Sequence, residues 1–182
     1  MKNVSRREFI RTGSLAAAGI SLLPGEAAAR QRAGRTVRVG FIGTGNRGTS
    51  HVNNLLTIEG TEIVAVCDIA DSRAGNAAEI CRKKGRPTPV VYSGDKMVYK
   101  KMLDKEKLDA VIISTYWDSH ASIAIDAMNH GIYPGIEVPA AITIDDTWKL
   151  VDTSEKTGIP CMMLENWSFR QDNLALLNMK RL

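Results

Sequence analysis

The sequence lacks the features that mark membrane, nucleic-acid-binding and repeat proteins. Its apolar run near the N-terminus, Gly13 to Leu23, is too short and too weakly hydrophobic to span a bilayer, so no stable membrane anchor is expected. The formal net charge is only +4, and four basic against two acidic residues in positions 1–29 carry +2 of it. No basic patch remains that would indicate nucleic acid as a partner. Internal repeats and low-complexity tracts are absent as well.

Cysteine is also scarce, since Cys67, Cys81 and Cys161 are an odd number without metal-ligand spacing. No disulfide framework is therefore expected. Cys67 and Cys161 lie in or beside predicted strands, where small buried hydrophobic residues are typical. The sequence contains no metal-type cluster, no Walker phosphate loop and no nucleophile elbow, so no metal is predicted.

What is present is a globular composition, 44% hydrophobic and 24% charged, with alternating strand and helix patterns over one domain's worth of chain. Six βα repeats predict an α/β fold of the Rossmann type, a doubly wound parallel sheet. The expected strands are 37–43, 62–67, 90–92, 110–114, 133–137 and 160–164. The expected helices are 46–58, 72–84, 95–103, 119–130, 144–157 and 170–182.

A G-x-G-x-x-G motif joins the first strand to the first helix. Gly43 makes the tight turn, Gly45 lets backbone amides approach a pyrophosphate, and Gly48 lets the helix pack closely on the sheet. The helix that opens near Asn46 points free N–H groups and its positive dipole end at the phosphates. The motif is preceded by a strand and followed by a helix, a second strand and an acidic residue. This order and these spacings are typical of a dinucleotide-binding site.

The acid is Asp68, twenty residues after Gly48 at the tip of the second strand. It is placed to accept hydrogen bonds from a ribose 2′-hydroxyl and to repel a 2′-phosphate. Ile69 and Ala70, directly after it, offer no arginine for such a phosphate. The predicted cofactor is therefore NAD.

Polar residues follow the carboxyl ends of the later strands, where sites form in such sheets. We expect residues 43–48, 68, 115–120, 137–139 and 165–170 to face one crevice. Trp117 can cover a ring face there, and His120 can donate to cofactor or substrate. The alternative makes Ser119 a helix N-cap and His120 a surface residue of the first turn.

Three more ionisable residues carry separate expectations. Glu137 closes a buried-type strand, which favours a ligand-binding or catalytic role but leaves helix capping open. His51 is expected to pack along the first helix, and His130, before Gly131, to serve a helix C-terminus. The catalytic candidates are therefore His120 and Glu137.

The N-terminus carries a twin-arginine pattern, Ser5-Arg6-Arg7-Glu8-Phe9, followed by the apolar run and by Ala27-Ala28-Ala29. This predicts a signal peptide at 1–29, the twin-arginine export machinery as a partner, and a periplasmic location. Because that route carries folded proteins, the cofactor would be loaded in the cytoplasm.

These features together resemble the N-terminal domain of the Gfo/Idh/MocA oxidoreductase superfamily, and within it glycoside hydrolase family 109, exported NAD-dependent α-N-acetylgalactosaminidases. The matching segments are Gly43–Gly48 with His51, Asp68, Trp117–His120, Glu137-Val138-Pro139, and Leu164-Glu165-Asn166 with Arg170. The resemblance implies NAD contacts from Asn46, Arg47, Asp68, Trp117, Asp118, Ser119, His120, Glu137, Val138 and Asn166.

The resemblance also implies a chemistry and a carbohydrate substrate. Dehydrogenases of the superfamily carry E-K-P, whose lysine relays the alcohol proton, whereas this chain has Val138 in that place. The hydrolase relatives oxidise a sugar hydroxyl to a ketone, eliminate the glycosidic oxygen, add water and return the hydride from NADH. The net redox change is zero, unlike the two-carboxylate route of most glycosidases.

Relatives of this kind continue into a β-rich substrate domain, and Phe169 stands where they often have tyrosine. The expected organisation is a linker at 30–35, an NAD-binding domain at 36–164 and the start of a truncated C-terminal α+β domain at 165–182. The chain alone would then be an inactive cofactor-binding half. A periplasmic sugar dehydrogenase, a non-catalytic NAD-binding fragment and a homo-oligomer remain open alternatives.

Overall fold

The computed structural model describes residues 35–167 and 170–179. The signal peptide predicted at 1–29, most of the predicted linker, Phe169 and the last three residues lie outside this range. Residues 36–182 belong to one compact unit.

The centre of this unit is a parallel sheet of six strands in the order β3-β2-β1-β4-β5-β6, which confirms the predicted doubly wound fold. The strands are β1 (Val37–Ile42), β2 (Thr61–Asp68), β3 (Val90–Ser93), β4 (Ala110–Ile113), β5 (Tyr133–Ile136) and β6 (Met162–Met163). The chain winds outward from β1 to β3, then returns to place β4 on the other side of β1. The connections that leave the carboxyl ends of β1 and β4 therefore run to opposite faces of the sheet, and ligands bind in the crevice between such connections.

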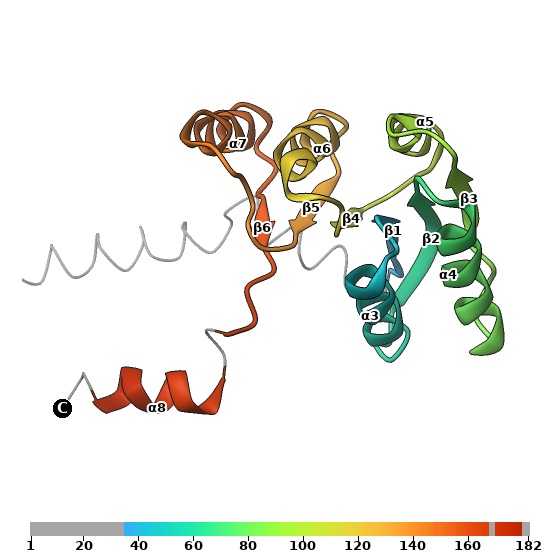
Figure 1. The fold of residues 1–182 in the computed structure, drawn as a ribbon, viewed down its shortest axis with the longest axis horizontal. Coiled ribbons are helices and arrows are strands. Elements are labelled where there is room, and N and C mark those ends of the chain that lie inside the picture. The colour runs from blue at the N-terminus through green and yellow to red at the C-terminus, as the bar shows by residue number, and fades with distance from the viewer. Residues whose placement is uncertain (1–34, 168–169, 180–182) are drawn as a thin grey trace, which may run out of the picture. The chain divides into compact units, whose positions relative to one another are not determined.

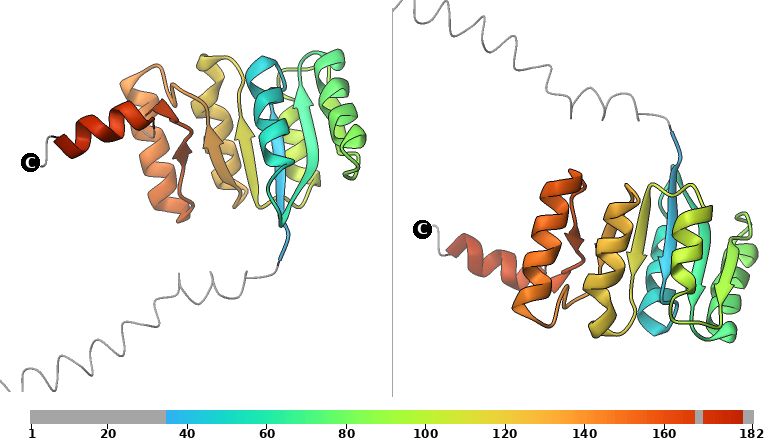
Figure 2. Two further views of the ribbon diagram at one scale, coloured as in Figure 1. Left: turned by 90° about the horizontal axis from the view of Figure 1, so that it is seen from below. Right: turned by 90° about the horizontal axis from the view of Figure 1, so that it is seen from above.

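Helices cover both faces of the sheet (Figure 1). On one face lie α3 (Asn46–Leu55) and α4 (Asp71–Lys83); on the other lie α5 (Val98–Lys105), α6 (Trp117–Asn129) and α7 (Ile144–Thr157). Figure 2 shows the strands running side by side between these layers. The last described helix, α8 (Gln171–Met179), buries no residue.

Successive side chains along a strand point to opposite faces of the sheet, so the core has two parts. In β1, Phe41 packs toward α3 and α4, with Val52 and Cys81, whereas Ile42 joins the larger cluster under α5 and α6. Cys67 is buried in that larger cluster, as predicted, and burial followed by the charge of Asp68 raises the pKa of its thiol to about 12.

Two predicted boundaries shift for local reasons. The helix expected from residue 95 begins at Val98, because the Asp95 carboxylate accepts a hydrogen bond from the Met97 N–H at 2.6 Å and holds a turn there. The helix expected from residue 119 begins at Trp117 with Tyr116 as its N-cap. The alternative that Ser119 is the N-cap is therefore wrong; its hydroxyl donates to the Tyr116 carbonyl within the first turn.

His130 is the C-cap of α6, as predicted. Its Nδ1 lies 2.7 Å from the Asp126 carbonyl oxygen and its Nε2 lies 3.0 Å from the Asp104 carboxylate. These bonds, the backbone one first, raise the pKa of His130 above its ordinary value.

The glycine turn fixes how α3 meets the sheet. Gly43 has a φ of +86°, a conformation that favours glycine. A Cβ added to Gly48 would stand 1.9 Å from the Gly43 carbonyl oxygen, so only a residue without a side chain allows this approach. The predicted roles of Gly43 in the turn and Gly48 in close helix packing agree with this geometry.

This packing predicts opposite effects for two glycine-to-alanine changes. Gly48→Ala should lower the free energy of unfolding by roughly 1–3 kcal/mol, because backbone must shift to relieve the overlap. Gly75→Ala, on an exposed site of α4 where a Cβ would meet nothing within 4 Å, should raise it by about 0.5–1 kcal/mol. Urea unfolding of both variants checks this, and equal effects would contradict the close-packing account.

Candidate functional site

A cavity of about 640 Å³ opens at the carboxyl ends of β1, β2 and β4. Its lining includes Gly43, Gly45, Asp68, Arg73, Thr115 and Ser119. Three of the five strand ends predicted to share a crevice therefore meet here. Glu137 and residues 165–167 do not line the cavity, because β5 and β6 lie beyond β4 in the sheet.

Asp68 is held firmly at the edge of this cavity. Its Oδ2 accepts the Thr44 N–H at 2.7 Å and the Thr44 hydroxyl at 3.3 Å, and its Oδ1 accepts the Ala70 N–H at 2.9 Å. The residue is only 6% exposed. These bonds orient the carboxylate before any ligand arrives, which suits an acceptor for ribose hydroxyls.

The glycine turn leaves room for a phosphate group. Gly45 has an ordinary φ of −63°, and a Cβ added to it would meet only the Arg73 guanidinium, at 3.7 Å. Neither backbone strain nor protein packing therefore requires glycine at this position, and the open space beside it allows a ligand to approach the backbone. No side chain caps α3 and its first turn holds no acidic residue, which leaves its N–H groups open to an anion.

A second sign of a ligand is Ser114, which lines the cavity after β4. Its hydroxyl oxygen is buried and has no hydrogen-bond partner within the described part of the chain. Buried polar atoms are rarely left without a partner. The lining therefore fits a dinucleotide that supplies the missing contact.

His120 was expected either to donate to the cofactor or substrate or to lie on the surface of the first helical turn. It is 1% exposed, so the surface alternative is wrong. Its Nδ1 lies 2.8 Å from the Pro139 carbonyl oxygen and its Nε2 lies 3.1 Å from the Thr115 carbonyl oxygen. The ring thus joins the loop after β4 to the loop after β5, and its contacts with cofactor or substrate stay predictions.

The remaining predicted contacts lie around the cavity mouth. Asp118 and Ser119 are part of its lining, whereas Trp117 is 63% exposed and is not. Asn46 and Asn166 are exposed. A bound cofactor at these side chains remains a prediction.

Glu137 forms a compact ionic cluster with α3. Its Oε1 lies 2.6 Å from Arg47 Nε and 2.5 Å from His51 Nε2, while its Oε2 accepts the Val138 N–H at 3.2 Å. Burial works to raise the pKa of Glu137, but the hydrogen bonds from His51 and then Arg47 outweigh it and hold the pKa below its ordinary value.

Two expectations are corrected by this cluster. His51 reaches across to Glu137 instead of packing along its own helix, because α3 lies beside the loop that follows β5. Glu137 caps no helix, since the N-cap of α7 is Thr143, whose hydroxyl accepts the Asp146 N–H. Sequence spacing could not show either contact, because 86 positions separate His51 from Glu137.

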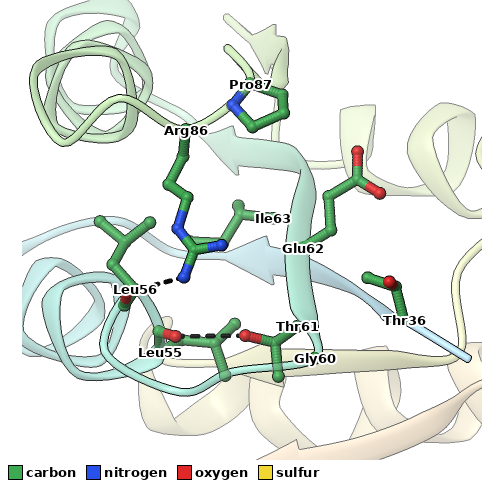
Figure 3. A pocket seen from close by; sticks show the side chains of 9 residues that line it. All are labelled: Thr36, Leu55, Leu56, Gly60, Thr61, Glu62, Ile63, Arg86 and Pro87. Atoms are coloured by element: carbon green, nitrogen blue, oxygen red, sulfur yellow. Dashed lines mark hydrogen bonds between the residues drawn. The ribbon is translucent and has the colours of Figure 1, made fainter. Parts of the chain in front are cut away.

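A smaller cavity of about 250 Å³ lies at the amino ends of β1 and β2, away from the glycine turn (Figure 3). Arg86 donates to the Leu56 carbonyl there at 3.2 Å, and the Thr61 hydroxyl donates to the Leu55 carbonyl at 3.2 Å. These two side chains provide hydrogen-bond donors for carbonyl groups at the C-terminal end of α3. The cavity is thus lined by groups that already have structural partners.

Two other kinds of site were sought in residues 35–167 and 170–179. They contain no group of three or more His, Cys, Asp or Glu side chains that could hold a metal ion. Within the same ranges, no helix has the length and apolar character needed to cross a membrane.

Comparison with known proteins agrees with this geometry. Residues 37–165 match the model of the Gfo/Idh/MocA oxidoreductase family, described as an NAD-binding Rossmann fold. The chain belongs to this family. Its cofactor is NAD, consistent with Asp68 and the glycine turn.

Curated relatives include glycosyl hydrolase family 109 protein 1 of Shewanella sp. ANA-3, which is 40% identical, and an alpha-N-acetylgalactosaminidase of Shewanella oneidensis, which is 37% identical. Both alignments cover all of this chain but 43% of the relative. The chain therefore spans less than half the length of these proteins.

Solved structures of dehydrogenases share the fold. Myo-inositol dehydrogenase from Lactobacillus casei, in complex with NAD(H) and myo-inositol, is 26% identical with a TM-score of 0.69; the match covers 80% of this chain and 41% of that one. The WlbA dehydrogenase from Bordetella pertussis, with NADH and UDP-GlcNAcA, has a TM-score of 0.70 at 18% identity, covering 81% and 42%. The latter likeness concerns the fold alone.

Within this Gfo/Idh/MocA domain, several cavity residues were not predicted from the sequence, and Arg73 and Ser114 are two of them. Arg73, in the first turn of α4, lines the cavity together with Asp68 and Gly45. Ile69 and Ala70, the two residues directly after Asp68, carry no charge, so the nearest cation along the chain is Arg73. Arg73 follows Asp68 by five positions, and the first turn of α4 brings it back to the cavity. An extended chain would carry a residue at that spacing away from Asp68.

The cluster around Glu137 predicts a pH-dependent stability. A carboxylate with a lowered folded pKa stabilises the fold above its unfolded pKa and loses that contribution as pH falls through the folded value. Glu137→Gln should therefore cost about 1–3 kcal/mol near neutral pH. The difference from wild type should shrink once the pH falls below the ordinary value of 4.5.

Urea unfolding across this pH range measures the effect. Glu155→Gln, at an exposed site of α7, serves as the matched control and should show a small difference at every pH. A Glu137→Gln deficit that stays constant down to low pH would contradict an ionised Glu137.

Proposed function

We propose that this chain is the NAD-binding part of a glycosidase that releases terminal α-linked N-acetylgalactosamine. The named relatives at 37–40% identity support this, as does the presence in this chain of Trp117–His120 and Glu137-Val138-Pro139, segments that carry the resemblance. Because the chain covers 43% of those relatives, the proposal concerns a protein of their full length.

The observation that carries the proposal is the side chain after Glu137. Val138 is half-buried and holds no exchangeable proton, whereas dehydrogenases that resemble this chain have a proton-relaying lysine there. Glu137 does not replace the lysine readily, since Arg47 and His51 already occupy one of its oxygens. A dehydrogenase built on this domain would lack its usual acid–base group.

The domain's own residues serve to bind and orient the cofactor. Asp68 would accept a hydrogen bond from the ribose, the N-terminus of α3 would hold the pyrophosphate, and Gly45 leaves space for it. When bound, NAD supplies a reversible hydride acceptor, so a sugar hydroxyl can be oxidised and later restored with no net redox change. The transient ketone acidifies the adjacent C–H, which permits elimination of the glycosidic oxygen and addition of water.

A sugar dehydrogenase is the second candidate, and the likeness to myo-inositol dehydrogenase favours it. The two candidates differ in redox balance. A dehydrogenase accumulates NADH in proportion to substrate consumed, whereas the glycosidase route returns every hydride to the sugar.

Export is a separate part of the proposal. The twin-arginine pattern Ser5–Phe9, the apolar run and Ala27-Ala28-Ala29 support a periplasmic protein. A reaction with no net redox change suits that compartment, because bound NAD then needs no recycling.

A protein of the relatives' full length that contains this chain should cleave a chromogenic α-N-acetylgalactosaminide with NAD present in catalytic amount. In deuterated water, proton abstraction next to the transient ketone should place deuterium at C2 of the released sugar. Mass spectrometry of the sugar and absorbance at 340 nm are the measurements. The 182-residue chain alone should bind NAD without turnover.

Three results would decide against this account. Cleavage without deuterium at C2 would exclude the elimination route. Stoichiometric NADH would favour the dehydrogenase, and turnover by the 182-residue chain alone would show that no further substrate-binding domain is needed.

The export proposal predicts a mature N-terminus at Arg30, because Ala27-x-Ala29 fits a signal-peptidase site. N-terminal sequencing of periplasmic material is the measurement, with Arg6→Lys and Arg7→Lys together as the variant that should stop export. Material in the periplasm that still begins at Met1 would contradict the prediction.

A further inference from the structure

Charge is unevenly distributed along this chain. Residues 82–107, from the last turn of α4 through β3 to just past the end of α5, contain nine basic and three acidic residues, a net charge of +6. The other residues from position 36 onward contain eight basic and fifteen acidic residues, a net charge of −7. The small net charge of the whole chain therefore conceals a basic segment within an otherwise acidic domain.

This segment lies at one edge of the sheet. β3 is the edge strand, and α4 and α5 flank it on the two opposite faces (Figure 1). On α5, Lys100 pairs with Asp126 of α6 at 3.2 Å, so that side of the helix faces α6. Lys101 and Lys105 are exposed and stand four positions apart, so they share the side of α5 that points away from α6 and toward the β3 edge.

The C-terminal end of α4 supplies the second row of basic residues. Arg82 and Lys83 stand in the last turn of α4, and Lys84 is its C-cap; all three are exposed. Arg82 donates two hydrogen bonds of 2.6 Å to Glu79, and Lys83 Nζ lies 3.7 Å from the same carboxylate. Glu79 thus balances part of their charge, and Lys84 is the cation that this end of the helix leaves available.

Three lysines and two valines define what we call the β3-edge surface. Lys84, Lys101 and Lys105 form no side-chain hydrogen bond or ion pair within residues 35–167 and 170–179. Between the two rows lie Val90 and Val91 of β3, which are 47% and 42% exposed. Free lysines beside exposed aliphatic side chains are typical of surfaces that bind at a lipid interface, where the lysines meet anionic headgroups.

The composition of this surface favours lipid over nucleic acid as its partner. Proteins read duplex bases mainly with arginine and amide side chains, and they stack single-stranded bases on aromatic rings. None of the five residues that define the β3-edge surface is an arginine, an amide or an aromatic residue. Lysine carries a compact point charge, which suits a plane of headgroups without a fixed donor geometry.

We propose that the β3-edge surface docks this domain reversibly on a membrane surface that contains anionic phospholipid. The helix α7, toward the other end of the sheet, carries four acidic residues and two lysines, so the same lipids repel it. This polarity turns the β3 edge toward the membrane and fixes one orientation of docking. The inference is independent of the glycosidase proposal.

Acetylation of lysine side chains, followed residue by residue with mass spectrometry, tests the proposal on the 182-residue chain. Vesicles of phosphatidylglycerol and phosphatidylcholine are the probe, and vesicles of phosphatidylcholine alone are the control. The anionic vesicles should slow the acetylation of Lys84, Lys101 and Lys105 but not that of Lys149 and Lys156 on α7. In about 1 M salt, where the Debye length falls to about 3 Å, this protection should be lost. A readout for each residue is needed because positions 1–34 contain six basic residues that also attract anionic vesicles.

A double variant tests whether the two rows act together. Lys101→Gln combined with Lys105→Gln should raise the lipid concentration that half-protects Lys84 by roughly tenfold to a hundredfold. The matched control, Lys149→Gln combined with Lys156→Gln, also removes two exposed lysines from one helix, one of them in its last turn, and should leave that concentration unchanged. Circular dichroism establishes that each variant is folded.

The unmodified chain alone can overturn the proposal, so the test does not depend on the folding of a variant. Absence of protection at the three lysines of the β3-edge surface would do so, as would equal protection by neutral vesicles or equal protection of the α7 lysines. Protection by duplex DNA but not by anionic vesicles would also overturn it and identify a nucleic-acid surface instead.

Discussion

The contact between Gly48 and the Gly43 carbonyl is the constraint on which the rest of the site depends. With no side chain at Gly48, α3 can begin directly against the end of β1. That approach directs the uncapped N-terminus of α3 into the cavity and leaves the space beside Gly45 free of protein. The same approach brings Arg47 and His51 within reach of Glu137. One absent Cβ thus sets the phosphate-binding end of the helix and the ionic cluster on its side.

Glu137 links the loop after β5 to the helix α3, which follows β1, at the carboxyl ends of the strands. It follows β5, whereas its partners Arg47 and His51 belong to the helix that follows β1. His120 makes a comparable link between the loops after β4 and β5, through the carbonyl groups of Thr115 and Pro139. Both residues had been considered for catalysis, and both hold loops around the crevice. Their hydrogen bonds give the site a fixed shape, which is a requirement for orienting a dinucleotide.

Asp68 shows how the domain holds a ribose acceptor in a fixed orientation. The N–H groups of Thr44 and Ala70 and the N-terminus of α4 favour negative charge, and the Asp68 carboxylate supplies it. An acceptor held in this way suits the 2′-hydroxyl of NAD. Under the proposed function, Val138 would likewise decide the chemistry, because its side chain cannot relay a proton.

The sequence by itself determined the fold class, the glycine turn, Asp68 and the family, because these depend on short-range patterns. Strand periodicity, three glycines and an acid at a fixed distance lie within 32 residues, from Val37 to Asp68, and each has a local physical reason. Helix ends were predicted less accurately. The helix α6 begins at Trp117 with Tyr116 as its N-cap, two residues before the predicted start, because capping depends on neighbouring loops.

Only the tertiary structure decided which distant residues meet. His51 pairs with Glu137 across 86 positions, and His120 is buried by two loops that no periodicity connects. Arg73 reaches the cavity through the turn of a helix. Such contacts arise when parallel strands bring their carboxyl ends to one edge, a consequence of sheet order that spacing along the chain does not reveal.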